Sequence, residues 1–173
     1  GGFQFMSIYF SSMLAGKGYL KCGEYDVYRE EFAGGKADVV VSGYYGFGNM
    51  GDESLLDVIA ATLAEEIPGV KIAALTRHPK ADARRTGLRC VPRFSPQAVG
   101  TIAGAKLLIS GGGSLLQDHT STRSLLYYLS VMSLARLRGK KVMLFANGIG
   151  PVNRPKNQQR VKKVVEQADL VTL

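Results

Sequence analysis

Cysteine and histidine are scarce in this chain, and their scarcity excludes two kinds of site. The sequence holds two cysteines, Cys22 and Cys90, and two histidines, His78 and His119. The cysteines lie far apart and in no spacing typical of metal ligands, so we expect free thiols in a reducing compartment and no disulfide framework. These few residues do not make a zinc site, and we expect no metal.

The chain also lacks an apolar run long enough to cross a bilayer. Residues 3–14 are mostly apolar and uncharged, but they are too few for a membrane span, and no positive residues precede them as in a signal peptide. We interpret residues 1–37 as an N-terminal extension and residues 38–173 as one Rossmann-like domain. Residues 169–173 resemble the beginning of a strand, so we expect the chain to be part of a longer protein.

Acidic residues are few as well: 14 Asp and Glu stand against 22 Lys and Arg, which gives a net charge of +8. The basic residues gather in two blocks, at 77–93 and 136–163. Solvated helix faces are one interpretation; an anionic substrate, an anionic membrane surface and nucleic acid are the others. Aromatic residues do not alternate with these blocks and no nucleic-acid motif stands out, so we expect no nucleic-acid partner.

Predicted strands and helices alternate regularly from residue 38 onward. Short apolar runs predict strands, and apolar residues at helical spacing, such as Leu56, Ile59 and Leu63, predict helices. This alternation is typical of an α/β fold with a doubly wound parallel sheet covered on both faces. Strands are predicted at 38–42, 71–76, 88–91, 106–110, 141–146 and 169–173, helices at 52–66, after Ser95, at 120–138 and at 155–167, and a basic loop around His78 and Pro79.

Glycine-rich turns follow three of these predicted strands. They read SGYYGFGNMGDE at 42–53, ISGGGS at 109–114 and FANGIGP at 145–151. In a parallel sheet, ligands bind at the carboxyl edge of the strands, where helix N-termini point toward them. We therefore predict that the three turns meet on one edge of the sheet and form the site there.

The first turn satisfies the dinucleotide fingerprint G-x-G-x-x-G, which indicates an NAD(P)-binding Rossmann module as one alternative. Two features oppose it. Asp52 and Glu53 stand where a diphosphate would rest, and the predicted second strand ends in Thr76 and Arg77 instead of an acid for the ribose hydroxyls. A simpler interpretation of Asp52 is the N-cap of the following helix.

Candidate site residues lie in the first two turns. Two adjacent tyrosines on a loop cannot both point into the core, so at least one phenol is expected to face the ligand. In the second turn, three glycines allow close backbone approach, and the polar side chains after them supply hydrogen bonds. The candidates for binding are Tyr44, Tyr45, Gly46, Asn49, Gly111, Gly112, Gly113, Ser114, Gln117 and Arg123, and the candidates for catalysis are Asp52 and Asp118.

These segments together resemble the polysaccharide pyruvyl transferase family. The likeness rests on SGYYGFGNMGDE at 42–53, GGGSLLQD at 111–118, STRSLLYY at 121–128 and GIGP at 148–151, in that order, and runs from about residue 38 to the end. It is closest to the bacterial CsaB members, which pyruvylate secondary cell-wall polysaccharide. Many relatives carry Asn where this chain has Gly48, which makes the dinucleotide fingerprint accidental.

The resemblance implies the N-terminal half of a GT-B-like enzyme. Such an enzyme moves pyruvyl from phosphoenolpyruvate, without a cofactor, to two hydroxyls of an N-acetylmannosamine unit on a lipid-linked precursor at the inner membrane face. The resulting ketal anchors surface-layer proteins. Most candidates above would then bind the acceptor sugar, with Asp118 or Asp52 accepting a proton. Donor-binding basic residues lie largely in a second half in relatives, so the chain by itself is expected to be inactive. A nucleotide-sugar glycosyltransferase of the same architecture is the other alternative.

Overall fold

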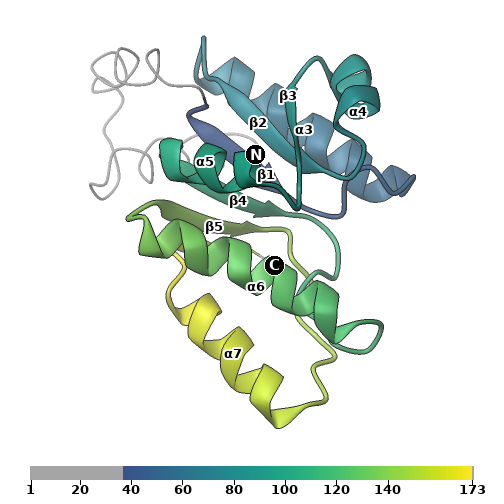
Figure 1. The fold of residues 1–173 in the computed structure, drawn as a ribbon, viewed down its shortest axis with the longest axis vertical. Coiled ribbons are helices and arrows are strands. Elements are labelled where there is room, and N and C mark those ends of the chain that lie inside the picture. The colour runs from purple at the N-terminus through teal and green to yellow at the C-terminus, as the bar shows by residue number, and fades with distance from the viewer. Residues whose placement is uncertain (1–36, 173) are drawn as a thin grey trace.

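The computed structural model describes residues 37–172, and the sheet at its centre has six parallel strands. The strand order is β3-β2-β1-β4-β5-β6, with helices on both faces, as Figure 1 shows. This confirms the predicted doubly wound, Rossmann-like α/β fold. The elements are β1 Val39–Ser42, α3 Met50–Glu66, β2 Ile72–Thr76, α4 Pro79–Thr86, β3 Arg89–Pro92, α5 Pro96–Gly104, β4 Leu107–Gly111, α6 Thr122–Leu137, β5 Lys141–Phe145, α7 Pro155–Glu166 and β6 Leu170–Val171.

The central strands are apolar because both of their faces are covered. All four residues of β1 are buried, and alternate side chains point to opposite faces of the sheet. Val39 and Val41 pack with Leu56, Ile59 and Leu63 of α3 in one core. Val40 belongs to the second core, which α5, α6 and α7 cover. The two apolar layers fix the sheet between them and leave its carboxyl edge for the connecting loops.

Helix α3 begins earlier than expected, and its cap is a different residue. The predicted N-cap was Asp52, but the helix starts at Met50, and Asn49 caps it by accepting a hydrogen bond from the Gly51 amide at 3.1 Å. Asp52 therefore lies in the first turn, where its charge suits the positive end of the helix dipole. The predicted end is confirmed: the last helical residue is Glu66, just before Pro68 and Gly69.

Helix α4 occupies the segment for which a basic loop was predicted, so that prediction was wrong. Its sequence, PKADARRT, carries no apolar stripe, which is the signal that marks a helix in a sequence. The structure shows the two end signals instead: proline in the first turn and Gly87 in the left-handed conformation after the last residue (φ 71°). Arg85 joins this helix to α3 through Asp57 at 2.7 Å.

Serine N-caps set where helices α5 and α6 begin. Ser95 caps α5 as predicted, accepting a bond from the Ala98 amide with Pro96 in the first turn. Ser121 caps α6, which therefore starts two residues later than expected. Within residues 37–172, no helix has both the length and the apolar character needed to cross a bilayer. The proposed N-terminal extension, 1–37, lies outside the described residues apart from Ala37, which is buried.

A buried phenol connects the loops after β1 and β4. Tyr45 is 1% exposed, and its hydroxyl donates a hydrogen bond to the Gly111 carbonyl at 2.8 Å. On its other side the Tyr45 carbonyl accepts a bond from the Arg77 amide at the end of β2. Burial raises the pKa of the Tyr45 phenol far above its usual range, so the group stays a hydrogen-bond donor. Tyr45 therefore ties three strand ends together.

Replacing this tyrosine tests that role. We expect Tyr45→Phe to lower the free energy of unfolding by about 1 kcal/mol, because it removes one buried hydrogen bond and keeps the ring. Urea denaturation monitored by circular dichroism measures the change. The matched control is Tyr44→Phe, whose side chain is 38% exposed and which should change stability by less than about 0.5 kcal/mol. Equal effects of the two substitutions would contradict the assignment.

Candidate functional site

The glycine-rich loops meet at the carboxyl edge of the sheet, as predicted. Besides the link through Tyr45, the Gly148 amide donates to the Gly113 carbonyl at 3.0 Å, and Leu116 pairs with Ile149 in an isolated parallel bridge. The loop after β5 therefore supports the loop after β4 from one side, while the loop after β1 lies on the other. The loops after β1 and β4, more than sixty residues apart in sequence, therefore lie side by side with the loop after β5 at the carboxyl edge of the sheet.

A polar pocket of about 440 Å³ opens between the first and second loops. Most of the residues that line it carry a hydroxyl, amide or carboxylate group, which suits a ligand rich in hydroxyls. The predicted site residues that line it are Tyr44, Asn49, Asp52, Gly113, Ser114 and Gln117. Thr120, Ser121, Ser124 and Tyr128 line it as well, and sequence reasoning did not single them out as site residues. We call this hollow the polar pocket.

Of the two adjacent tyrosines, one lies in the core and the other at the surface. Tyr45 is buried and holds the loops, so it does not face the pocket, whereas Tyr44 is exposed and lines it. The ring of Tyr44 stacks on Phe47 at a centroid distance of 3.9 Å and an interplanar angle of 8°. The expectation that at least one phenol faces the edge is met by Tyr44, while Tyr45 acts through the loops it positions.

Asp52 places a buried carboxylate in the polar pocket. The residue is 7% exposed, and burial raises the pKa of its carboxyl above the usual range, with Glu53 adding to the shift and the Asn49 amide opposing it. Gly113 faces it in the left-handed conformation (φ 66°), and a Cβ there would stand 2.6 Å from the Asp52 carboxylate oxygen. Glycine at 113 therefore keeps this carboxylate accessible, and the raised pKa makes it a better proton acceptor.

The remaining predicted glycines lie where the loops pack against neighbouring helices. Gly111 and Gly112 are buried, and a Cβ on them would meet Ile59 and Leu55 of α3. Gly46 is buried in the left-handed conformation (φ 78°), and a Cβ there would meet the Asp82 carboxylate. Of the predicted glycines, Gly113 faces the polar pocket, and the others let the loops pack closely against α3 and α4.

The amides of the first loop are already engaged. The Gly48 amide donates to the Glu53 carboxylate at 3.2 Å, and the Gly51 amide donates to Asn49. A dinucleotide diphosphate at a Rossmann fingerprint depends on free amides at this point of the loop. These contacts and the acidic first turn of α3 disfavour the NAD(P) alternative.

Asp118, the second predicted proton acceptor, lies outside the polar pocket. Its carboxylate stabilises the loop after β5 and the start of α7. Its carboxylate accepts bonds from the Asn153 amide at 2.7 Å, the Arg154 amide at 3.1 Å and the Asn157 side chain at 2.8 Å. These bonds, the one from Asn153 foremost, lower the pKa of the Asp118 carboxyl. A carboxylate whose oxygens are so occupied is a poor base, so the geometry does not support the catalytic role expected for it.

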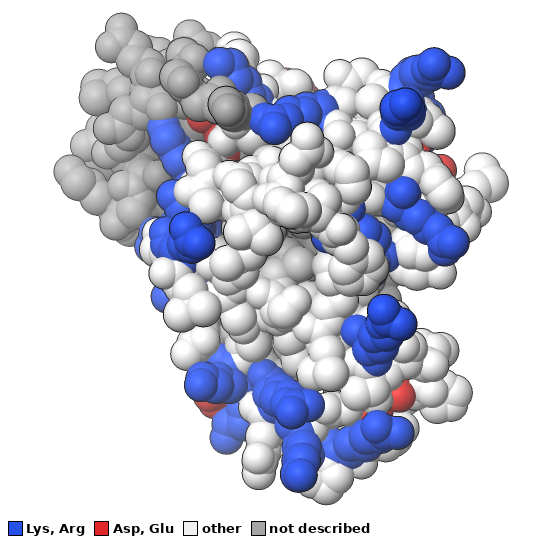
Figure 2. Space-filling model, in the orientation of Figure 1, with Lys and Arg blue, Asp and Glu red and all other residues white. Residues whose placement is uncertain are grey.

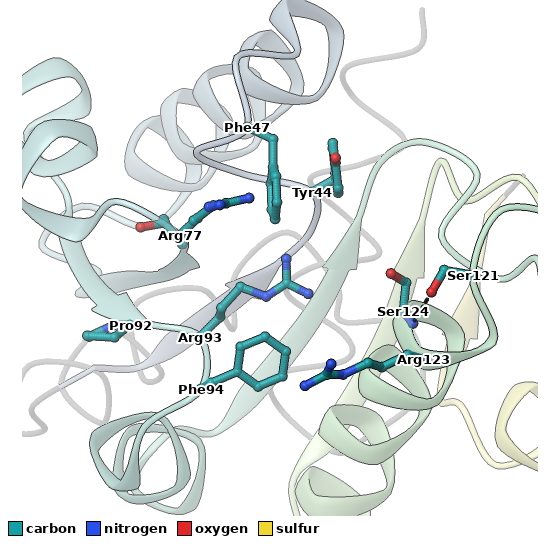
Figure 3. A pocket seen from close by; sticks show the side chains of 10 residues that line it. Tyr44, Phe47, Arg77, Pro92, Arg93, Phe94, Ser121, Arg123 and Ser124 are labelled. Atoms are coloured by element: carbon teal, nitrogen blue, oxygen red, sulfur yellow. Dashed lines mark hydrogen bonds between the residues drawn. The ribbon is translucent and has the colours of Figure 1, made fainter.

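An arginine pocket of about 500 Å³ adjoins the polar pocket and shares Tyr44, Ser121 and Ser124 with it. Figure 3 shows the side chains of Arg77, Arg93 and Arg123 entering this hollow from the ends of β2 and β3 and from α6. Phe47 and Phe94 form its apolar walls. Arg123 was expected in the site. Sequence reasoning did not include Arg77 and Arg93 among the site candidates, although Arg77 directly follows a predicted strand and Arg93 comes two residues after the next one.

A parallel sheet whose carboxyl edge carries such loops and hollows defines a Rossmann-like ligand-binding domain. A model of the polysaccharide pyruvyl transferase family matches residues 49–173, more than two thirds of the chain. The chain therefore belongs to the polysaccharide pyruvyl transferase family, and this membership supports a transferase with a polysaccharide acceptor. No curated protein matches the chain.

The role of Asp118 predicts a pH dependence of stability. A carboxyl with a lowered pKa in the folded state stabilises the protein fully above its unfolded pKa of about 3.9, and this contribution is lost as the pH falls through the folded value. We expect Asp118→Asn to melt at a lower temperature than the wild type at pH 7, and the difference to shrink below about pH 4. Differential scanning calorimetry from pH 7 to pH 3 measures it. A difference that stays constant over this range would contradict the assignment.

Proposed function

We propose that this chain is the N-terminal half of a GT-B-like enzyme that transfers pyruvyl from phosphoenolpyruvate to an N-acetylmannosamine unit of a lipid-linked cell-wall polysaccharide precursor. The product is a cyclic ketal that anchors surface-layer proteins. Family membership supports a transferase that acts on polysaccharide. The donor, the acceptor and the anchoring role rest on the likeness of the loops to the CsaB members. No cofactor is needed for this reaction.

One observation carries the assignment to this site. The polar pocket is built jointly by the first and second glycine-rich loops, which are the segments that resemble the family, and its lining suits a sugar. Tyr44 offers an aromatic face of the kind that stacks on sugar rings. Asn49, Ser114 and Gln117 offer side-chain hydrogen bonds to hydroxyls. On this basis we assign the acceptor sugar to the polar pocket.

The chemistry requires one proton donor and acceptors for two hydroxyl protons. Protonation of the methylene carbon of phosphoenolpyruvate makes an oxocarbenium-like centre, which one sugar hydroxyl attacks. The carbon–oxygen bond to phosphate then breaks, and the second hydroxyl closes the ring. One hydroxyl proton balances the proton given to carbon, and the other leaves with inorganic phosphate. Nothing is oxidised or reduced.

Asp52 is the group in the described chain best placed to accept a hydroxyl proton. It is the one carboxylate that lines the polar pocket among residues 37–172, and its raised pKa makes it a stronger base than an ordinary aspartate. The proton donor to carbon and most of the donor-binding cations are assigned to a second α/β half, as the resemblance implies. This proposal predicts that neither half is active without the other.

Location follows from the acceptor and from the charge. A lipid-linked precursor places the enzyme in the cytoplasm at the inner face of the membrane. Figure 2 shows one face of the molecule on which Lys and Arg far outnumber Asp and Glu. Such a surface is attracted to anionic lipid headgroups, and the attraction falls with added salt. We propose peripheral association on this basis.

The glycosyltransferase alternative differs in its donor. A nucleotide-sugar donor would need a second hollow that fits a base and a ribose, whereas phosphoenolpyruvate needs only cations. Family membership favours pyruvyl transfer. Protection of the chain against thermal unfolding by a UDP-sugar, with none by an acceptor disaccharide, would favour the alternative.

A transfer assay tests the proposal. The chain joined to its second half should release phosphate from phosphoenolpyruvate when a lipid-linked acceptor containing N-acetylmannosamine is present, and mass spectrometry of the glycan should show one added pyruvyl ketal. The 173-residue chain by itself should give neither signal. Phosphate release without a change in the glycan, or ketal formation by the isolated chain, would refute the respective part of the proposal.

Asp52→Asn tests the proposed proton acceptor in the same assay. Loss of a general base lowers the rate by about 100-fold or more, so we expect at least that loss in kcat. Wild-type activity should fall as the pH drops through the raised pKa of Asp52, since the protonated carboxyl cannot accept a proton, and this acid limb should be absent from the residual activity of the variant. Asp57→Asn, an exposed carboxylate farther along α3, is the control and should retain both rate and pH profile.

A further inference from the structure

The arginine pocket has a second neighbour, an apolar groove between α5 and α6. The groove has a volume of about 440 Å³ and shares Arg93, Phe94 and Arg123 with the arginine pocket. The polar pocket adjoins the arginine pocket through different residues, Tyr44, Ser121 and Ser124. Three hollows of different chemistry therefore follow one another: polar, cationic and apolar. The residues that make the groove apolar are Ala98, Val99, Ile102, Leu126, Val131 and Leu134.

No acidic side chain of residues 37–172 forms an ion pair with the cations in the middle hollow, Arg77, Arg93 and Arg123. The Nε atom of Arg93 is buried and lacks a hydrogen-bond partner in the described part of the chain. Three guanidinium groups that have no acidic partner among residues 37–172 surround one hollow and repel one another, and an anion placed between them relieves that repulsion.

Aromatic rings hold the central arginine in place instead of an acid. The Arg93 Cζ atom lies 4.2 Å from the ring centroid of Tyr127, 4.9 Å from that of Phe94 and 5.1 Å from that of Phe47. Arg77 also lies over Phe47, at 5.0 Å. These cation–π contacts fix planar guanidinium groups without cancelling their charge. The hollow is therefore prepared for a phosphate, which takes bidentate bonds from arginine.

The groove next to these cations exposes apolar side chains. Phe94 is 71% exposed, Val99 42% and Leu126 38%. Phe94 belongs to both hollows, so the apolar surface begins directly at the cationic one. A free anion makes no use of such a surface, and an uncharged apolar molecule makes no use of the arginines. One ligand that satisfies both is a phosphate ester of an apolar chain.

We propose that the three hollows bind one amphiphilic ligand in register: the sugar in the polar pocket, its diphosphate among Arg77, Arg93 and Arg123, and the first part of an apolar chain in the groove between α5 and α6. The inference rests on the proposed function, because it takes the acceptor to be a lipid-linked sugar. It adds the residues that recognise the diphosphate and the chain, and it assigns the arginine pocket to the acceptor and not to the donor.

Isothermal titration calorimetry of the 173-residue chain with soluble probes tests the inference. Geranyl diphosphate should bind at least tenfold more tightly than inorganic pyrophosphate, because its chain buries apolar surface in the groove. Arg123→Gln, at an exposed position on α6, should weaken both ligands by about tenfold or more, since hydrogen bonds to charged groups are the strong ones. Arg84→Gln, an exposed arginine of α4 outside all three hollows, removes the same charge and should change neither affinity by more than about twofold.

A second variant separates the groove from the cations. Val99→Thr combined with Leu126→Gln keeps side-chain size at two exposed positions and makes the groove polar. This variant should bind pyrophosphate as the wild type does and lose the tenfold advantage of geranyl diphosphate. Equal binding of both ligands by the wild type would overturn the assignment of the groove. Phosphoenolpyruvate binding that is as tight as pyrophosphate binding and is lost in Arg123→Gln would overturn the assignment to the acceptor.

The outcome is separable from that of the proposed function. Pyruvyl transfer by the complete enzyme to a lipid-free disaccharide depends on the polar pocket and not on the groove. If transfer occurs while geranyl diphosphate does not bind, the inference fails and the proposed function stands. If geranyl diphosphate binds as expected and no pyruvyl ketal forms on any acceptor, the proposed function fails, and the chain retains a site for an amphiphilic diphosphate.

Discussion

The site depends on one buried hydrogen bond, from the phenol of Tyr45 to the carbonyl of Gly111. The sheet brings the ends of β1 and β4 side by side, but it does not fix the loops that follow them. The rigid aromatic side chain of Tyr45 reaches from the first loop to the second, and its backbone carbonyl accepts a hydrogen bond from the Arg77 amide. Because the polar and arginine pockets are bounded by these same loops, their shapes follow from the position of this ring. Tyr44, its neighbour in sequence, is thereby held at the surface where both pockets use it.

The two candidate carboxylates, Asp52 and Asp118, have different surroundings, and their pKa values shift in opposite directions. Asp52 is buried with few donors, which raises its pKa, whereas Asp118 accepts three hydrogen bonds, which lower it. Two residues of the same type therefore do different work on the same edge of the sheet. Asp118 orders the loop that follows β5 and the start of α7, and Asp52 offers a carboxylate to the polar pocket. This separation of pKa values is the feature by which a base is distinguished from a structural anion.

Much of this could be predicted from the sequence, and the failures have physical causes. Apolar strand runs and glycine-rich turns are local signals, so the fold and the meeting of the loops were predictable. The role of Asp118 was not, because its partners lie 35 to 39 residues away. Arg77 and Arg93 carry no local pattern within a basic block; only the strand order, which sets β2 beside β1 and β3 beside β2, brings them to Phe47. Asn49 and Asp52 are equally good caps by residue type, and the backbone alone decides between them.

The enclosure of Arg93 by aromatic rings has a consequence for how the pocket responds to acidity. An arginine keeps its proton throughout the range in which proteins remain folded, and the rings around it carry no charge that titrates there. The ring centroid of Tyr128 also lies 5.6 Å from the Arg93 Cζ atom, and burial raises the pKa of this phenol to about 12. The positive charge of Arg93 is therefore constant with pH. A pH dependence in the affinity of this hollow for an anion then reports the ionisation of the bound molecule or of the neighbouring Asp52 carboxylate, whose charge acts on Tyr128.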